Sequence, residues 1–225
     1  VKEYPLGKLS VRALDGVSVS FGEGEFAAIA APSGAGKTTL LNLIGCVDVP
    51  TSGVVRIDGQ STSELSDKGL TALRLHKLGF IFQTFNLIAV LDVYQNVEFP
   101  LLLKGGMTKK ERDRRIREIV EQVGLEKQMK QRPNELSGGQ RQRVAIARAL
   151  VTKPKIVLAD EPTANLDSTT GQNIIAAMKE INRKERTTFI FSTHDPMVME
   201  QAERVIRMAD GKIVGETEQG TEGVA

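Results

Sequence analysis

Phe26-Ala27-Ala28-Ile29-Ala30-Ala31-Pro32-Ser33-Gly34-Ala35-Gly36-Lys37-Thr38 is the stretch that decides the fold. Its first five residues form an apolar run of strand length, and residues 37–46 repeat apolar side chains at helical spacing. The turn between them matches the pattern G-x-x-x-x-G-K-[ST], except that Ala31 replaces the first glycine. We call residues 31–38 the glycine loop. The order strand, glycine loop, helix predicts an α/β fold whose turn binds phosphate.

The residue types of the glycine loop suit a phosphate chain and its metal ion. Backbone N–H groups from Gly34 to Thr39 can surround a β-phosphate, Lys37 can neutralise β- and γ-oxygens, and the Thr38 hydroxyl can bind Mg²⁺. Ala31 fits only with a negative φ. A plain turn before a core helix is the alternative. The expected nucleotide contacts are Ser33, Gly34, Ala35, Gly36, Lys37, Thr38 and Thr39.

A second glycine-rich segment, Leu136-Ser137-Gly138-Gly139-Gln140, precedes an amphipathic pattern over residues 140–151. Its free N–H groups and the positive end of the helix dipole also suit an anion. It either competes with the glycine loop for one phosphate or forms the second half of a site. Because a helical segment separates it from Lys37, we expect it to contact a nucleotide held by a second chain.

Two carboxylates follow the apolar run of residues 155–159. Asp160 stands at the end of a predicted buried strand, where it can hold Mg²⁺ through water beside the glycine loop. Glu161 can act as general base on an attacking water, but neighbouring strand residues face opposite sides. Both acids therefore serve one site only if the strand twists at its end. Capping of a turn before Pro162 is the alternative role of Glu161.

The composition of the 225-residue chain indicates an ordinary globular protein. Thirty basic and 28 acidic residues leave a net charge of +2, which gives no reason to expect nucleic-acid binding. The single cysteine, Cys46, has apolar neighbours and is expected to be buried. The longest apolar run, residues 85–90, is too short to cross a bilayer, and no signal-like start is seen. We expect a cytosolic chain that reaches a membrane only through a partner.

Strand and helix patterns alternate along the rest of the chain. Residues 11–21 and the turn at 22–25 predict an antiparallel start, and residues 92–123 predict helices with a solvated charged face at 109–117. The remaining expected elements are strands at 53–57, 78–82 and 188–192 and helices at 169–184 and 196–202. We expect a single domain, residues 1–225, whose parts are a core of 1–83 and 152–215, a helical subdomain of 84–151 and a mobile tail of 216–225.

Five motifs resemble those of ATP-binding cassette (ABC) ATPases, in the same order. Residues 136–140 are similar to the family signature, 159–163 to its Walker B segment and 165–167 to its D-loop. Gln83 resembles the Q-loop residue, and His194 resembles the switch histidine that contacts the γ-phosphate. The resemblance extends over nearly the whole chain.

Taken singly, some of these residues have simpler interpretations. A lone glutamine is usually a surface or strand-end residue, and a histidine beside an aspartate is usually a structural hydrogen-bonded pair. Tyr4 lies 33 positions before Lys37, where the family often has an aromatic residue that stacks on adenine. A frayed chain end is its alternative.

The resemblance implies a P-loop NTPase core. This core is RecA-like, with a mostly parallel sheet and flanking helices, and carries an N-terminal antiparallel β subdomain and an inserted α-helical subdomain. ATP and Mg²⁺ are the implied cofactors, ATP hydrolysis is the reaction, and a head-to-tail homodimer forms with ATP. The implied catalytic residues are Glu161, His194 and Gln83; the metal ligands are Thr38, Gln83 and Asp160; the further nucleotide contacts are Tyr4, Ser137, Gly138, Gly139, Gln140 and Asp167.

Finer features resemble the lipoprotein-release and macrolide-export ATPases, namely the segments 43–48, 82–87 and 96–101. That subgroup implies integral membrane permease subunits as partners, on the cytoplasmic face of the membrane, and no direct contact with the cargo. Residues 85–90 would then line the groove for the permease, with core packing of the helical subdomain as the alternative. A regulatory ATPase of the cell-division type, which signals across the membrane without moving cargo, is the alternative function.

Overall fold

A computed structural model describes residues 1–7 and 9–218 of the chain. Its strands are β1 Lys2–Leu6, β2 Leu9–Leu14, β3 Phe26–Ala30, β4 Arg56–Ile57, β5 Gln60–Ser61, β6 Leu78–Ile81, β7 Ile156–Asp160, β8 Thr188–Thr193, β9 Arg204–Ala209 and β10 Lys212–Glu218. Its α-helices are α1 Lys37–Ile44, α2 Asp67–Lys77, α3 Val93–Lys104, α4 Lys109–Gln122, α5 Gly138–Leu150, α6 Ser168–Glu185 and α7 Pro196–Gln201.

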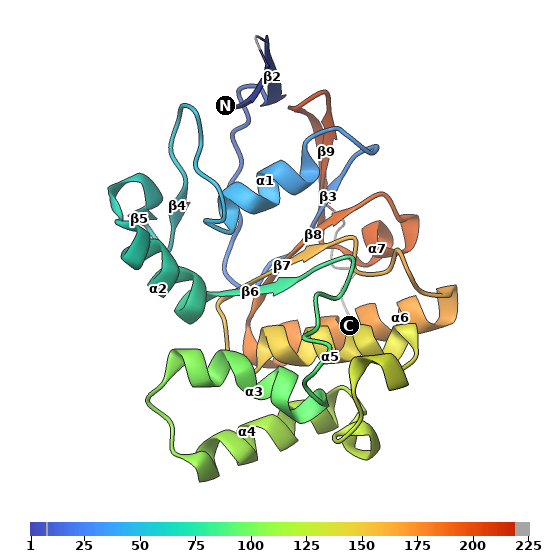
Figure 1. Ribbon diagram of the computed structural model, residues 1–225. Coiled ribbons are helices and arrows are strands. Elements are labelled where there is room, and N and C mark those ends of the chain that lie inside the picture. Colours follow the sequence, from blue (N-terminus) through green and yellow to red (C-terminus); the bar gives the residue numbers. More distant parts are fainter. Residues whose placement is uncertain (8, 219–225) are drawn as a thin grey trace, which may run out of the picture.

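A central sheet carries the fold (Figure 1). Within the described residues it has six strands in the order β10-β9-β3-β8-β7-β6, and only β10 pairs antiparallel to its neighbour. β3 lies between β8 and β9, and all five of its residues are buried. The continuous apolar run of residues 26–30 is therefore explained by burial of both strand faces. The expected α/β class with a mostly parallel sheet is confirmed.

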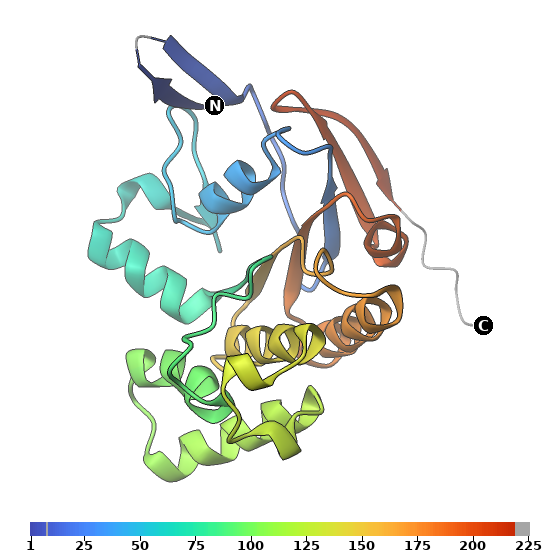
Figure 2. The same ribbon diagram turned by 45° about the vertical axis from the view of Figure 1, so that its right-hand side comes forward.

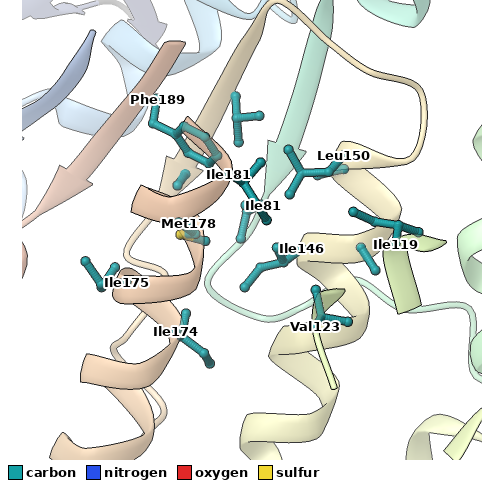
Figure 3. Packing of buried hydrophobic residues seen from close by; sticks show 14 of the residues in the cluster. Ile81, Ile119, Val123, Ile146, Leu150, Ile174, Ile175, Met178, Ile181 and Phe189 are labelled. Atoms are coloured by element: carbon teal, nitrogen blue, oxygen red, sulfur yellow. The ribbon is translucent and has the colours of Figure 1, made fainter. Parts of the chain in front are cut away.

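Two apolar layers cover the two faces of this sheet. Ile29, Leu158 and Ile190 pack with apolar residues of α1 on one face. On the other face, Phe189 and Ile81 pack with residues of α5 and α6, such as Ile146 and Met178 (Figure 3). Residues on one strand alternate between the two clusters, as side chains on a pleated strand must. The layers hold the carboxyl ends of β3, β6, β7 and β8 in one place.

The segment between β6 and β7 folds into a helical unit, formed by α3, α4 and α5 at the bottom of Figure 1. Each helix starts with a capping box, in which the N-cap side chain and the third helical residue satisfy each other's backbone N–H. The three pairs are Asp92 with Gln95, Thr108 with Glu111 and Ser137 with Gln140. The β1–β2 hairpin lies at the opposite end of the molecule (Figure 2).

The expected antiparallel β structure at the start of the chain is confirmed, but its expected strands and turn are wrong. No strand runs through residues 15–25, and the turn at Gly22–Glu25 does not join two antiparallel strands. Instead β2 pairs with β1, which is not among the expected elements. β3 is central and finds its partners, β8 and β9, near the other end of the sequence. Local alternation of residue types could not reveal such distant pairing.

The expectation of a solvated face over residues 109–117 is wrong at Arg115. This side chain is buried, and its guanidinium donates to the carbonyl oxygens of Leu150 and Val151, both at 3.1 Å. These carbonyls belong to the end of α5, where intrahelical donors run out. Burial lowers the pKa of Arg115, with Glu185 and Glu118 acting in the opposite direction. Arg115 thus joins α4 to the last turn of α5.

Other boundaries differ in smaller ways. The strand expected at 53–57 is reduced to β4, which within the described ranges pairs with β5 alone. Residues 216–218, placed in the tail, continue β10, and residues 219–225 lie outside the described residues. The helix α2 and the strands β9 and β10 had no counterpart in the expected elements. Within the described ranges, every helix is too short or too polar to span a lipid bilayer.

Candidate functional site

A cleft of about 320 Å³ lies at the carboxyl ends of the parallel strands. Its position agrees with the rule that open α/β sheets bind ligands at this edge. It brings together the glycine loop, the ends of β6 and β7 and the residue that follows β8. The lining residues are Ala13, Ser33, Gly34, Gly36, Lys37, Thr38, Thr39, Gln83, Asp160, Glu161 and His194.

The glycine loop connects β3 to α1 as expected. Gly34 and Gly36 have φ values of 81° and 96°, in the left-handed region, whereas Ala31 does not. Ala31 therefore takes the first position of the loop without the strain that a positive φ would cause. A Cβ atom at Gly36 would lie 2.5 Å from the carbonyl oxygen of Ala13, so no larger residue fits there. Gly36 is also the N-cap of α1 and leaves the first N–H groups of the helix without a side-chain cap.

Lys37 lies at the base of the cleft and is only 7% exposed. Its Nζ donates to the carbonyl oxygens of Ala31 at 2.7 Å and Pro32 at 3.1 Å. The same Nζ lies 3.5 Å from Oε1 of Glu161. A buried ammonium group requires such partners. The three contacts hold the charge of Lys37 where the loop meets the end of β7.

Thr38 and Asp160 meet across the cleft. The Thr38 hydroxyl donates to Oδ2 of Asp160 at 3.1 Å, with Oδ1 at 3.4 Å. These residues are 122 positions apart in the sequence, and the sheet brings β7 beside the start of α1. A hydroxyl and a carboxylate are oxygen donors of the kind that Mg²⁺ takes in phosphate sites. The donor set fits the metal ion that the sequence predicts.

Glu161 has a left-handed backbone, with a φ of 45°. Its N–H still donates to the carbonyl oxygen of Ser192 at 2.8 Å, so it follows directly on β7. This turn is the strand-ending twist that lets two adjacent acids, Asp160 and Glu161, both line the cleft. A left-handed non-glycine residue is strained, and such strain often occurs at functional sites.

His194 follows β8 and contacts Glu161, with 2.9 Å between Nδ1 and Oε1. Because an ionised carboxylate only accepts hydrogen bonds, Nδ1 of His194 carries the proton in this contact. Its side chain is 68% exposed toward the cleft mouth. Gln83 follows β6 and also lines the cleft, and its carbonyl oxygen accepts a hydrogen bond from Nδ2 of Asn165 at 2.8 Å.

The signature segment does not join this cleft. None of residues 136–140 is among the described residues that line it. Ser137 is exposed, caps α5 and accepts a hydrogen bond from Gln140, while Gly139 packs against Thr170 so closely that a Cβ atom would lie 2.5 Å away. The alternative in which this segment competes for the glycine loop's phosphate within one chain is therefore not favoured.

Asp167 and Tyr4 are not among the described residues that line the cleft. Asp167 caps α6, and its hydrogen bonds with Thr170 lower the pKa of the Asp167 carboxyl group. The Tyr4 hydroxyl donates to Oδ2 of Asp48 at 2.7 Å, and burial followed by this hydrogen bond raises the pKa of Tyr4. Tyr4 belongs to the ordered strand β1, so the frayed-end alternative is excluded. It does not line the cleft itself.

Several supporting residues were missed in the sequence. Ala13 lines the cleft from β2, and nothing in its residue type signals this. Gln142 is buried and donates to the carbonyl oxygen of Pro162 at 2.8 Å. Thr163 donates to Oδ2 of Asp195 at 2.8 Å and so joins the loops that carry Glu161 and His194. Gln142 stands between Arg141 and Arg143, and Thr163 stands between Pro162 and Ala164, so no local pattern points to these contacts.

Comparison with known proteins agrees with this geometry. The protein family described as ABC transporter matches residues 14–164. The ABC transporter ATP-binding protein MJ0796 of Methanocaldococcus jannaschii is 47% identical over 94% of this chain and 92% of its own length. Its solved dimeric structure superposes with a TM-score of 0.91, at 46% identity over 97% of this chain and 96% of that one. Another structure of the same cassette is a post-hydrolysis dimer bound to ADP and Pi, with the same TM-score, identity and coverage.

Two further relatives have named transport systems. The lipoprotein-releasing system ATP-binding protein LolD 1 of Rhodopseudomonas palustris is 42% identical over 95% of both chains. The macrolide export ATP-binding/permease protein MacB of Syntrophobacter fumaroxidans is 44% identical over 99% of this chain, which corresponds to 31% of MacB. The family match, these identities and the cassette fold agree, and the chain belongs to the ABC transporter family, as an ATP-binding and ATP-hydrolysing subunit.

Proposed function

We propose that two copies of this chain bind two ATP molecules head to tail. In each site the glycine loop of one chain holds the phosphates, and Ser137, Gly138 and Gly139 of the second chain cover the γ-phosphate. The observation that carries this proposal is the separation described above: the glycine loop, Asp160 and Glu161 line the cleft, while none of residues 136–140 lines it and Ser137 is exposed. Dimeric structures of the related cassette MJ0796 support it.

The residues of the cleft have different roles in ATP hydrolysis. Lys37 binds phosphate oxygens, and Thr38, Asp160 and Gln83 hold Mg²⁺, which neutralises phosphate charge when it is bound. Glu161 accepts a proton from the attacking water, and His194 hydrogen-bonds the γ-phosphate from the mouth of the cleft. The proximity of Glu161 to His194, 2.9 Å between Oε1 and Nδ1, supports their joint action. Tyr4 stacks on adenine, and Asp167 contacts the nucleotide across the dimer.

The partner of this subunit is an integral membrane permease. The segment between β6 and β7 carries exposed apolar side chains, and the strongly exposed ones are Val90 at 73%, Phe99 at 40%, Leu102 at 52% and Leu103 at 60%. Exposed apolar side chains that gather on one unit are typical of a docking surface. We assign this surface to the permease, which places the subunit on the cytoplasmic face of the membrane.

The transport system is of the lipoprotein-release or macrolide-export type. The similarity to LolD and MacB supports this assignment. In such a system closure of the dimer on ATP pulls on the permease, and the cargo never touches this chain. Affinity purification of the tagged chain from solubilised membranes tests the partner: we expect a permease with a large extracytoplasmic domain. Leu103→Glu should abolish the association and Leu6→Glu, which changes a similarly exposed leucine on the hairpin, should not.

Mixing two inactive variants tests the shared site. Lys37→Ala removes the phosphate-binding lysine, and Ser137→Arg blocks the signature. In a mixed dimer, the chain that carries Ser137→Arg supplies an intact Lys37, and the chain that carries Lys37→Ala supplies an intact Ser137, so one of the two sites is complete. ATPase activity should therefore reappear on mixing. If both residues served the same chain's site, each chain would carry one defect in its own site and the mixture would stay inactive.

A further inference from the structure

We infer that Gln142 is a positioning residue for Glu161, acting through the backbone of Pro162. This inference rests on the proposed role of Glu161 as general base. Gln142 is 0% exposed, and its Nε2 donates to the carbonyl oxygen of Pro162, the residue that follows Glu161, at 2.8 Å. It is a neutral side chain on α5 and lines no part of the cleft. It acts on the carboxylate only through the intervening peptide.

The backbone of Glu161 needs restraint because its conformation is strained. The φ of 45° at Glu161 lies in a region that non-glycine residues rarely adopt, and such a conformation persists only when neighbouring contacts fix it. Before Glu161 the contact is its own N–H bonded to Ser192 on β8. After Glu161, its own carbonyl oxygen accepts a hydrogen bond from the Ala164 N–H at 3.2 Å within the loop, and the Pro162 carbonyl oxygen accepts one from Gln142. The hydrogen bonds with Ser192 and Gln142 connect this loop to the sheet on one side and to α5 on the other.

The amide oxygen of Gln142, Oε1, also supports a specific role for the bond to Pro162. Among the described residues, its Oε1 is one of the buried side-chain polar atoms without a hydrogen-bond partner. An unpaired buried amide oxygen costs stability, and an apolar side chain of equal size would avoid that cost but would leave the Pro162 carbonyl oxygen without its donor. Within the described part of the chain, Gln142 therefore makes one hydrogen bond through Nε2 and leaves its Oε1 without a partner. That donor bonds to the carbonyl oxygen of Pro162, beside the proposed catalytic carboxylate.

The packing of α5 keeps this contact short. At Gly139 the helix α5 approaches α6 so closely that Thr170 leaves no room for a Cβ atom. Thr163, which follows Pro162, donates a hydrogen bond to Asp195 and so holds the loop that carries Glu161. Gln142 lies about one helical turn after Gly138, the first residue of α5. The helix that begins at the signature segment thus also fixes the base of its own chain. Movement of α5 on engaging a partner's nucleotide would shift Pro162 and Glu161.

Gln142→Met tests this inference, with Arg143→Met as its matched control. Met has nearly the size of Gln and lacks the donor, while Arg143 makes the same type of bond from α5, to the Val123 carbonyl oxygen at 2.9 Å, away from the cleft. We expect Gln142→Met to lower kcat by roughly 10- to 100-fold, as misplacement of a catalytic group does. The Kd for ATP and the melting temperature should change little, and Arg143→Met should keep the wild-type kcat. Gln142→Leu provides a second variant if the first does not fold.

Two results would overturn the inference: a wild-type kcat in Gln142→Met, or a loss of kcat that follows a loss of stability in both Gln142 variants. The background of Glu161→Gln separates this inference from the proposed function. There, Gln142→Met should not lower the residual ATPase rate further, because the group that it positions is already gone; an additional fold-loss equal to that in wild type would contradict the link. If Glu161→Gln alone hydrolyses ATP at the wild-type rate, the proposed base assignment fails instead.

Discussion

Lys37 and Glu161 share a buried contact, with 3.5 Å between Nζ and Oε1. The first comes from the glycine loop after β3 and the second from the turn after β7, so the parallel sheet brings a phosphate-binding cation to the proposed general base. The side chains are only 8% and 12% exposed. We expect a γ-phosphate that enters the cleft to compete with Glu161 for Lys37 and so to free the carboxylate for the attacking water. The contact would then link nucleotide binding to catalysis.

Lys37→Met should weaken ATP binding. The variant loses a charge-assisted hydrogen bond to phosphate, worth about 1.5–3 kcal/mol, and so the Kd for ATP should rise roughly 10- to 100-fold. Titration with a fluorescent ATP analogue measures this, and Lys153→Met, which alters a lysine outside the cleft, is the control. An unchanged Kd would mean that Lys37 serves only the backbone carbonyls of Ala31 and Pro32.

His194→Ala should lower turnover more than nucleotide affinity. Its ring contacts Glu161 and stands at the mouth of the cleft, where general acid–base contacts contribute about 100- to 10,000-fold; we expect a loss near the lower end because Glu161 remains. Steady-state ATPase rates and nucleotide titrations measure the two quantities. The chain's other histidine, His76, is exposed on α2, and His76→Ala is the matched control. Turnover equal to wild type would remove His194 from the site.

Ser137→Arg should block ATP-driven dimerisation but leave ATP binding by the monomer intact. A large cation would occupy the surface that faces the partner's nucleotide. The substitution also removes the α5 cap, which costs about 1 kcal/mol. Thr108→Arg removes the equivalent capping box from α4 and controls for that loss. Light scattering gives the mass of each variant with ATP. Equal loss of binding and dimerisation would show that Ser137 has only a structural role.

Arg115→Met should destabilise the helical unit without touching the cleft. Removal of the guanidinium leaves two buried carbonyls, of Leu150 and Val151, without their donor, at a cost of about 1–3 kcal/mol. Urea denaturation measures the free energy of unfolding. Arg114→Met changes the neighbouring exposed arginine and should have little effect. An equal stability for both variants would contradict the structural role of Arg115.

The fold could be predicted where its signal is local. Residues 26–38 carry strand, loop and helix in consecutive positions, and β7 with Asp160 and Glu161 is recognised the same way. The N-terminal antiparallel β structure is expected from the sequence, but its first strand, β1, is not, because the alternating pattern is recognised only over residues 11–21. The burial of Arg115 could not be predicted for a related reason. A run of charged residues indicates a solvent-exposed helix face. Only the position of the end of α5 in the folded chain shows the carbonyl groups to which Arg115 donates.

The candidate site also has residues that the sequence identifies and contacts that it does not. Residue types and spacing identify Lys37, Thr38 and Asp160, since each follows from the chemistry of a phosphate and its metal ion. The left-handed φ of Glu161, its contact with Lys37 and the bond from Gln142 depend on how separate segments pack. A single sequence carries no local pattern for such contacts. They emerge only when β3, β7 and α5 are placed together.

Size-exclusion chromatography of Glu161→Gln, with and without ATP and Mg²⁺, tests the central claim most directly. This variant should bind ATP but fail to hydrolyse it, so the closed dimer accumulates. We predict elution as a monomer without nucleotide and as a dimer with ATP and Mg²⁺, and adding Ser137→Arg should return the elution to that of a monomer. Elution of Glu161→Gln as a monomer in saturating ATP would contradict a site shared between two chains.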